Sequence, residues 1–275
     1  MYLQCGKFRL SLSRPLIMGV VNTTPDSFFD GGKFASTQAA VTRVKELIDA
    51  GADIIDIGGE STRPGAGGVT LDEERRRVLP VLEQFAGGTV PISVDTQKPE
   101  LMRDALAAGA AMINDINALL APGAVEAVAA STAAVCLMHK KGAPADMQLD
   151  PYYDDVVAEV LAFLQERVKA ARAAGIAAER IVVDPGFGFG KTLAHNLEML
   201  RQLGRFGETG AVVLAGISRK TMLGRITGRD VGERLPASVA AALIAVEKGA
   251  RIVRVHDVAA TRDALAVWLA VQGNN

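Results

Sequence analysis

Several residues suited to chemistry stand at the ends of short apolar runs in this sequence. The polar residues at these ends are Asn22, Asp95, Asn114, Asp184, Ser218, Arg219, Lys220, Arg254 and His256. Some have an ordinary alternative, because Asp95 before Thr96 suits a helix N-cap and Asp184 before Pro185 suits a turn. Six run ends of this kind in one chain are harder to attribute to capping, so we expect these side chains to form one site.

Four of these side chains form a set suited to a flat, amide-like heterocycle. They are Asp95, Asn114, Asp184 and Lys220. Carboxylates accept hydrogen bonds from ring N–H and amino groups, while asparagine both donates and accepts. The set favours a pterin-like or purine-like ring, and each hydrogen bond to a charged group is worth roughly 1.5–3 kcal/mol in a buried site.

A second set of side chains suits an anion. Its members are Asn22, Arg63, Arg254 and His256. Arginine presents a rigid fork of donors, and the last two loops of an α/β barrel are its usual phosphate site. Alternatives stay open for two members: Arg63 also fits a solvated surface charge, and His256 also fits a helix-cap partner of Asp257.

Two familiar motifs are approached but not met. Residues 185–192 (PGFGFGKT) end like a Walker A loop, but the first glycine of that motif would fall at Pro185, so we interpret the segment as a shaped loop. The histidines at positions 139, 195 and 256 lack the spacing of a protein-bound zinc site. We expect His195 to have a structural or surface role.

The elements that would position these residues alternate along the chain. Short β-branched apolar runs are separated by alanine-rich segments with helical spacing, which is typical of βαβ units. The predicted strands are 16–21, 53–57, 91–94, 111–114, 134–138, 181–183, 212–215 and 252–255. Each is apolar on both faces, as in a sheet covered by helices. Eight such units favour a (β/α)8 TIM barrel of the α/β class over an open, doubly wound sheet.

The remaining segments are predicted to be turns and loops. Residues 1–14 fit a small N-terminal β-hairpin that plugs the bottom of the barrel. The stretches 22–36, 58–70 and 140–150 are too polar or glycine-rich for strand or helix. Because these loops follow predicted strands, we expect them at the carboxyl ends of the strands, where barrel enzymes carry out chemistry. No linker or repeat divides the chain, so one domain over 1–275 is expected.

Composition argues against several function classes. Lysine plus arginine (30) nearly balance aspartate plus glutamate (31), so no overall field points to nucleic acid or an anionic membrane. Cys5 and Cys136 are far apart, which fits a reducing compartment, and no apolar run reaches the roughly 18 residues of a membrane span. The N-terminus lacks the features of a secretion signal. We expect a cytoplasmic protein without nucleic-acid or membrane partners.

Two longer motifs resemble the signature segments of dihydropteroate synthases. They are residues 17–28 (IMGVVNTTPDSF) and 56–65 (DIGGESTRPG). The resemblance extends over essentially the whole chain, through the segments 93–96 (SVDT), 113–115 (IND), 137–139 (LMH), 184–189 (DPGFGF), 216–220 (GISRK) and 254–257 (RVHD). Two positions depart from the family pattern: Thr221, where serine is common, and Lys140-Lys141, where Met-Gln is often found.

The resemblance implies roles for individual residues. For the pterin it implies Asp95, Asn114, Asp184 and Lys220, with Ile116, Met138, Phe189 and Gly216 nearby and Arg254 against the ring. For the diphosphate it implies Arg254 and His256, with Asn22 helping to hold Mg²⁺. For p-aminobenzoate it implies Thr62, Arg63, Pro64, Phe189, Ser218, Lys220 and Thr221. The residues that it implies for catalysis are Asn22, Thr62, Arg63, Asp95, Lys220, Arg254 and His256.

The activity implied is condensation of 6-hydroxymethyl-7,8-dihydropterin diphosphate with p-aminobenzoate, giving 7,8-dihydropteroate and diphosphate. The resemblance also implies a homodimer and a sulfonamide target. Diphosphate would leave ahead of attack by the arylamine, with magnesium and cationic side chains stabilising its charge. Two alternatives stay open. One is a pterin-binding methyltransferase that acts with a corrinoid protein, and the other is a noncatalytic pterin-binding subunit, against which Asn22, Arg63 and Lys220 argue together.

Overall fold

The structure is a computed structural model that describes residues 1–23, 33–60, 68–142, 147 and 149–273. Eight parallel strands form a closed barrel in the order β10-β3-β4-β5-β6-β7-β8-β9. Their bounds are β3 Leu16–Asn22, β4 Ile54–Gly58, β5 Ile92–Asp95, β6 Met112–Asp115, β7 Ala134–Met138, β8 Ile181–Asp184, β9 Val212–Ala215 and β10 Ile252–Val255. Every predicted strand is confirmed to within one residue at each end. Pairing of β10 with β3 closes the sheet, which decides for the barrel over the open sheet.

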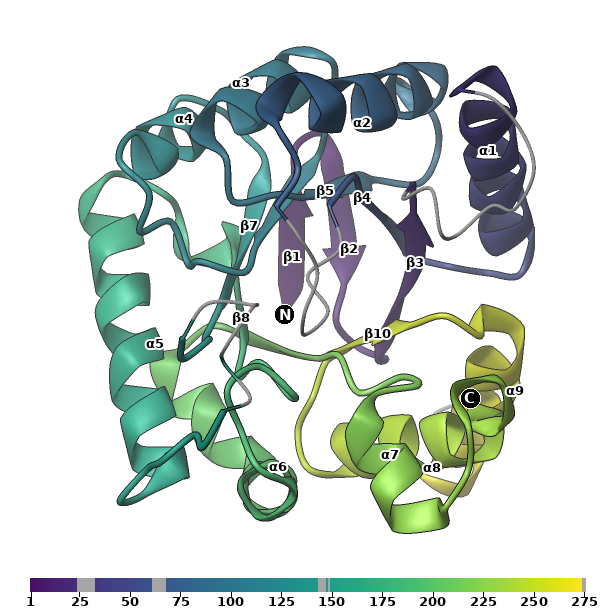
Figure 1. The fold of residues 1–275 in the computed structure, drawn as a ribbon, viewed down its shortest axis with the longest axis vertical. Helices are drawn as coiled ribbons and strands as arrows, with labels where there is room; N and C mark the ends of the chain where they lie inside the picture. The colour runs from purple at the N-terminus through teal and green to yellow at the C-terminus, as the bar shows by residue number, and fades with distance from the viewer. Residues whose placement is uncertain (24–32, 61–67, 143–146, 148, 274–275) are drawn as a thin grey trace.

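Helices surround the barrel on the outside (Figure 1). Their bounds are α1 Lys33–Asp49, α2 Leu71–Phe85, α3 Pro99–Ala107, α4 Ala124–Ala129, α5 Val156–Ala173, α6 Leu193–Arg201, α7 Thr221–Thr227, α8 Leu235–Glu247 and α9 Val258–Val271. Short 3₁₀ helices add η2 Ala178–Arg180, η3 Leu203–Thr209 and η4 Val231–Glu233. Among the described helices, none combines the length and apolarity that a membrane crossing needs.

Local sequence explains where these helices begin. The Thr70 side chain accepts a hydrogen bond from the backbone N–H of Glu73 and caps α2, while Asp155 accepts from the backbone of Val157 and Ala158 and caps α5. Pro99 begins α3 at a position where no intrahelical N–H bond is lost. The loop predicted over residues 22–36 is shorter than predicted, because α1 already begins at residue 33.

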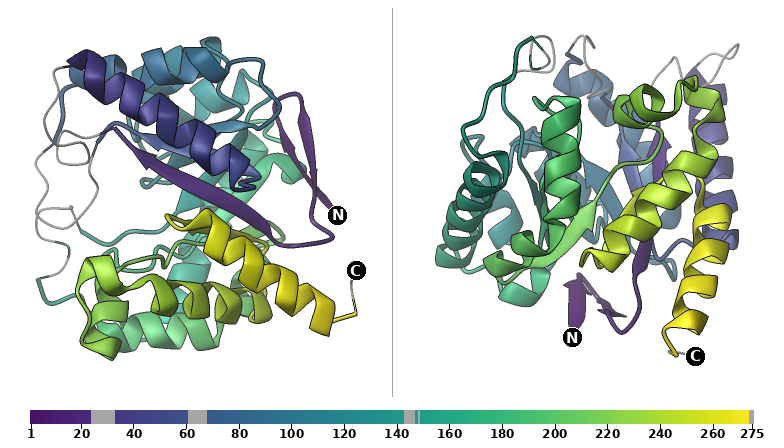
Figure 2. Two further views of the ribbon diagram at one scale, coloured as in Figure 1. Left: turned by 90° about the vertical axis from the view of Figure 1, so that its right-hand side faces the viewer. Right: turned by 90° about the horizontal axis from the view of Figure 1, so that it is seen from below.

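An N-terminal hairpin plugs the barrel at the amino ends of its strands (Figure 2), as predicted. Strands β1 (Tyr2–Cys5) and β2 (Phe8–Ser11) pair antiparallel around Gly6, which has a positive φ of 55°. The hairpin side chains at positions 3, 5 and 12 are buried against an inner cluster of barrel side chains. That cluster contains Met18, Ile54, Met112, Cys136, Val182, Leu214 and Ile252. Buried apolar side chains thereby fill the lower half of the barrel.

Candidate active site

The site is built by alternation along the barrel strands. Successive side chains of a strand point to opposite faces, so the residue two positions after each inner-cluster residue also points inward, one level higher. On six strands these residues are Asp56, Asn114, Met138, Asp184, Gly216 and Arg254. Apolar side chains therefore fill the lower level and mostly polar ones form the upper level. The strand register places Asn22 and Asp95 at the same height as Asn114. Asn22 is paired with Gly58, Gly58 with Asp95 and Asp95 with Asn114.

Arg254 lies at the centre of this upper level. Its Nε donates to Asp56 Oδ2 at 2.7 Å, and its Nη2 donates to Asp95 Oδ2 at 3.0 Å. Asn114 Nδ2 donates to the same Asp56 oxygen at 2.9 Å. The guanidinium thus joins two carboxylates from neighbouring strands, and the amide of a third strand completes the network. The alternative of Asp95 as a helix cap is wrong, because Lys98 holds the N-cap position of α3.

Asp56 was not singled out by sequence reasoning as a site residue. It lies inside the predicted strand 53–57 and inside a quoted motif, but an acidic residue within an apolar run carries no obvious signal of function. Its side chain is fully buried, and its Oδ1 has no hydrogen-bond partner among the described residues. The signal that identifies it is spacing, since Asp56 comes two residues after inward-facing Ile54. A buried acceptor without a partner is uncommon in folded proteins and marks the position as functionally interesting.

Burial shifts the acid–base behaviour of the two other carboxylates. Desolvation raises the pKa of Asp95 to about 7, opposed by the positive charge of Arg254 and reinforced by the negative charge of Asp56. Burial also raises the pKa of Asp184, opposed mainly by Lys220. Asp184 Oδ1 accepts from Gly186 N at 2.7 Å, which confirms the turn interpretation, while its Oδ2 remains directed toward the site.

Glycine keeps the space between Asp184 and Arg254 open. A Cβ atom on Gly216 would stand 3.7 Å from Asp184 Oδ2 and 3.8 Å from Arg254 Cβ. The two side chains therefore face the same end of the barrel from either side of this glycine. Polar groups that are widely separated in the sequence thus converge at one rim, as predicted.

Lys220 brings a second cation to the rim. Its Nζ donates to Phe187 O at 2.5 Å and lies 4.6 Å from the centre of the Phe189 ring. Burial lowers the pKa of Lys220 to about 8, although the charge of Asp184 opposes this shift. The four residues of the heterocycle set are therefore brought together, with Lys220 and Asp184 forming one side and Asp95 and Asn114 the other.

The glycine-rich segment after β8 is a shaped loop, as predicted. Its lysine, Lys191, is buried and donates to Gly186 O and Phe189 O, both at 2.9 Å, and lies 3.0 Å from His139 Nδ1. A Cβ on Gly186 would come within 1.9 Å of His139 O, so no larger residue fits there. His195 is structural, since its backbone and Nδ1 form a capping box with Thr192 at the start of α6.

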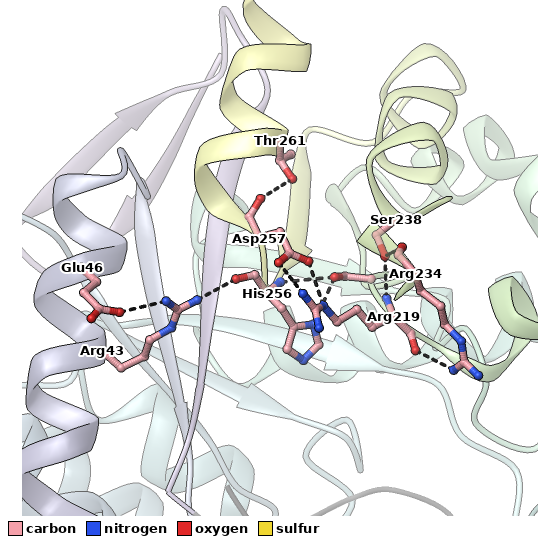
Figure 3. A network of polar contacts seen from close by, with 9 residues as sticks. Arg43, Glu46, Arg219, Arg234, Ser238, His256, Asp257 and Thr261 are labelled. Carbon is pink, nitrogen blue, oxygen red and sulfur yellow. Dashed lines mark hydrogen bonds and ion pairs between the residues drawn. The ribbon is translucent and has the colours of Figure 1, made fainter. Parts of the chain in front are cut away.

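Of the anion set, Asn22 ends β3, Arg254 lies in the neighbouring strand β10 and His256 follows that strand, whereas Arg63 lies outside the described residues. His256 Nδ1 is 3.0 Å from Ser218 Oγ, and Arg43 Nη2 donates to the backbone oxygen of His256 at 2.9 Å (Figure 3). The alternative role of His256 as a partner of Asp257 in capping α9 is not supported, because Asp257 instead binds Arg219. Asn22 is half-buried at the end of β3.

Other predicted contact residues are placed less centrally. Ile116 and Met138 line a cavity of about 200 Å³ together with Phe163 and Lys140, whose Nζ donates to Gln97. Thr221 is the exposed first residue of α7. The predicted p-aminobenzoate contacts Thr62, Arg63 and Pro64 lie outside the described residues. Within the described part of the chain, no three His, Cys, Asp or Glu side chains are grouped to hold a metal ion.

Comparison with known proteins agrees with this site. The model of the pterin binding enzyme family matches residues 18–256. The chain is 52% identical over 273 residues to the dihydropteroate synthase of Neisseria meningitidis serogroup C, covering 98% of this chain and 96% of the relative.

Two solved structures are also similar to this chain. A Xanthomonas albilineans dihydropteroate synthase with 4-aminobenzoic acid has a TM-score of 0.93 at 54% identity, covering 98% of both chains. The Burkholderia cenocepacia enzyme complexed with 7,8-dihydropteroate has a TM-score of 0.89 at 50% identity, covering 99% of this chain and 96% of the other. With a rim that suits a pterin and relatives matched over nearly their full length, this chain belongs to the dihydropteroate synthase family of pterin-binding enzymes.

Proposed function

We propose that this protein joins 6-hydroxymethyl-7,8-dihydropterin diphosphate to p-aminobenzoate and releases 7,8-dihydropteroate and diphosphate. It is a transferase that forms a C–N bond. The observation that carries the proposal is the polar rim, in which Asp56, Asp95, Asn114 and Asp184 surround Arg254 above an apolar barrel floor. The substrates are small molecules, as in the relatives solved with 4-aminobenzoic acid and with the product.

The acceptors of the rim match the donors of a pterin. A pterin presents a ring N–H and an exocyclic amino group along one edge, and carboxylates accept both. Asp184 Oδ2 is an acceptor directed into the site, Asp56 Oδ1 is a buried acceptor without a hydrogen-bond partner among the described residues, and Asn114 supplies a side chain that both donates and accepts. We assign the pterin edge to these three residues and the ring face to Arg254.

The diphosphate is assigned to His256, Arg254 and Asn22. Mg²⁺ prefers oxygen ligands, keeps several waters and takes few protein ligands beside substrate phosphates. The half-buried amide of Asn22, in register with the rim, supplies one oxygen ligand of this kind and fits a site that the substrate phosphates would complete. Bound magnesium would offset negative charge that grows on the leaving diphosphate.

Different side chains act on different bond changes of the reaction. The C–O bond of the pterin methyl group breaks, its electron pair departs with diphosphate, and the arylamine nitrogen forms the new bond and then loses a proton. Ionised Asp95 is placed to stabilise positive charge on the pterin during the first step. Arg254 and His256 stabilise the charge on the leaving diphosphate, and Lys220 acts beside Asp184 on the pterin side of the site. Because a neutral arylamine is already nucleophilic, no strong general base is needed.

The decisive assay is diphosphate formation on mixing the two substrates with magnesium. We expect diphosphate in proportion to 7,8-dihydropteroate, and none when either p-aminobenzoate or magnesium is omitted. A pterin-binding methyltransferase would release no diphosphate under these conditions. A noncatalytic subunit would bind the pterin in calorimetry without turnover. Either of these outcomes would reject the proposed function.

The role of Arg254 has its own test. We expect Arg254→Ala to weaken binding of the diphosphate substrate more than binding of the same pterin without diphosphate, because only the former meets the anion set. Calorimetry with both ligands measures the two losses separately. Equal losses would assign Arg254 to the ring alone.

We also propose a cytoplasmic homodimer. Support for the dimer comes from apolar side chains that stand exposed on α8 and α9, namely Ile244 (43% exposed), Val267 (67%) and Val271 (79%). Support for the compartment comes from Cys5 and Cys136, which are free and buried. Light scattering should give twice the chain mass, falling to one chain mass in the Val267→Glu variant. A monomeric wild-type protein would reject the dimer.

A further inference from the structure

We propose that Arg219 is a positioning residue, which holds Ser218, Lys220 and His256 in their reactive arrangement through an ion pair with Asp257. The inference rests on the proposed function and adds to it a residue that faces away from the substrates. The contacts that support it lie in the loop that joins β9 to α7 and at the end of β10, and Figure 3 shows this region from close by.

The backbone of Arg219 is held in an unfavourable conformation. Its φ is 58°, in the left-handed region that residues other than glycine rarely adopt, and such conformations persist where the surroundings enforce them. Two contacts enforce it here: the Arg219 N–H donates to Ser238 Oγ at 2.9 Å, and the Arg219 carbonyl accepts from Arg234 Nη1 at 3.0 Å. Both partners belong to the start of α8. The loop is therefore fixed from that side.

The side chain of Arg219 fixes the loop from the other side. Its Nε and Nη2 donate to the two carboxylate oxygens of Asp257 at 2.9 and 2.7 Å, a two-pronged arrangement that only a guanidinium can make. The residues just before make a parallel contact, since His256 N donates to Ser218 Oγ at 3.2 Å and His256 Nδ1 lies 3.0 Å from the same oxygen. Residue 218 thus contacts residue 256, and residue 219 contacts residue 257.

These contacts join the two strands where their backbone ladder has ended. The pairing of β9 with β10 stops at Val253 and Ala215, three residues before the Ser218–His256 contact and four before the Arg219–Asp257 pair. Beyond that point the side-chain contacts of Ser218 and Arg219 connect the two loops. Lys220, the next residue, enters the site and donates to Phe187 O, so the conformation of Arg219 determines where its side chain begins.

A purely stabilising ion pair would have a different signature. It would lower the fraction of folded protein when removed, and each folded molecule would turn over normally. A positioning residue lowers turnover per folded site, because Lys220 and His256 lose their alignment with the reacting atoms. Pterin binding should change less than turnover, since Asp56, Asn114 and Asp184 form no hydrogen bond with this loop pair among the described residues and only Lys220 of the pair belongs to the heterocycle set.

The test compares Arg219→Met with Arg229→Met. Arg229 lies nearby in sequence and forms an exposed ion pair with Glu233, so its replacement controls for loss of one surface cation. Calorimetry with the pterin counts binding sites, and kcat is expressed per site. We expect Arg219→Met to lose about tenfold or more in kcat, with a smaller rise in the pterin Kd, and Arg229→Met to match wild type in both.

Two further variants guard against a misfolded Arg219→Met protein. Ser238→Ala removes one of the two backbone tethers of Arg219, together with the bond from Ser238 Oγ to Arg234 O, and should show a smaller loss of kcat. Arg219→Lys, with a charge but no fork, should fall between wild type and Arg219→Met. Normal kcat per site in all three variants, or an equal loss in Arg229→Met, would overturn the proposal.

An NMR measurement separates this proposal from the proposed function. The ring nitrogens of His256 report its hydrogen bond to Ser218 whether or not turnover occurs, and the chain has only three histidines to assign. We expect the His256 signals to shift in Arg219→Met and to keep their wild-type positions in Arg229→Met. Absence of turnover in the wild type would reject the proposed function alone, whereas unchanged His256 signals in Arg219→Met would reject the positioning role.

Discussion

Replacing Arg254 with methionine should destabilise the fold by an amount that grows with pH. The guanidinium is the ion-pair partner of Asp56, which is fully buried, and of Asp95, whose side chain is 11% exposed. Removing one partner from a buried ion pair typically costs about 3–5 kcal/mol, because the remaining charge is left without compensation. The methionine side chain fills much of the space, so we assign this cost to charge.

The pH dependence follows from Asp95. Its pKa rises from 3.8 to about 7 in the folded protein, so the folded state binds an extra proton between these values and stability falls as pH rises through this range. Without Arg254 the pKa rises further, and the variant continues to lose stability above pH 7 at up to about 1.4 kcal/mol per unit. The difference from wild type should therefore grow by about 2 kcal/mol between about pH 7 and about pH 8.5.

Urea unfolding followed by circular dichroism measures this difference. Arg180→Met is the matched control, because Arg180 is also buried but donates to the backbone oxygens of Ala133 and Val128 and forms no ion pair within the described residues. Its cost should be independent of pH over the same range. A loss for Arg254→Met that is constant with pH, or that shrinks as pH rises, would refute the assignment of Asp95 as the group that takes up the proton.

Three other predictions follow from the rim and the floor. Asp184→Asn should keep its turn contact with Gly186 but raise the Kd for a pterin by roughly 10- to 100-fold, since a bond to a charged acceptor is worth about 1.5–3 kcal/mol; calorimetry giving an unchanged Kd would remove Asp184 from the ring site. In steady-state kinetics, kcat/KM should rise through about pH 7 as Asp95 ionises and fall above about pH 8 as Lys220 loses its proton, and a fall that persists in Lys220→Met would assign the upper limb to another group. Burial raises the pKa of both thiols, that of Cys5 to about 12, so neither should react with a disulfide reagent until urea unfolds the protein; rapid labelling of the native protein would contradict the plugged floor.

The strands and the rim positions could be predicted because their signals are local. A run such as 134–138 is apolar on both faces, and a polar residue such as Asp184 at the end of a run needs no knowledge of distant segments. In a closed barrel the carboxyl ends of all strands lie at one rim. Counting eight strands was therefore enough to predict that the polar residues at these ends meet. The hairpin at the N-terminus was predicted for the same reason, from a turn between two short strands.

What the sequence could not show is which groups pair across the barrel. Arg254 binds Asp56, 198 residues earlier in the chain, and nothing in either neighbourhood indicates the other. The same holds for Arg219 and Asp257, whose pairing depends on how two loops approach after the ladder between β9 and β10 has ended. The roles predicted for Thr62, Arg63 and Pro64 stay predictions, as they lie outside the described residues.

Pairing of the first barrel strand with the last has a consequence during synthesis. Residues 252–255 supply the partner of β3, so a growing chain that has not yet released them from the ribosome carries two open sheet edges. The same late segment contains Arg254, and His256 follows it directly. A chain cut short before residue 252 would therefore lack the central cation of the rim and would keep two unpaired strand edges, which favour self-association.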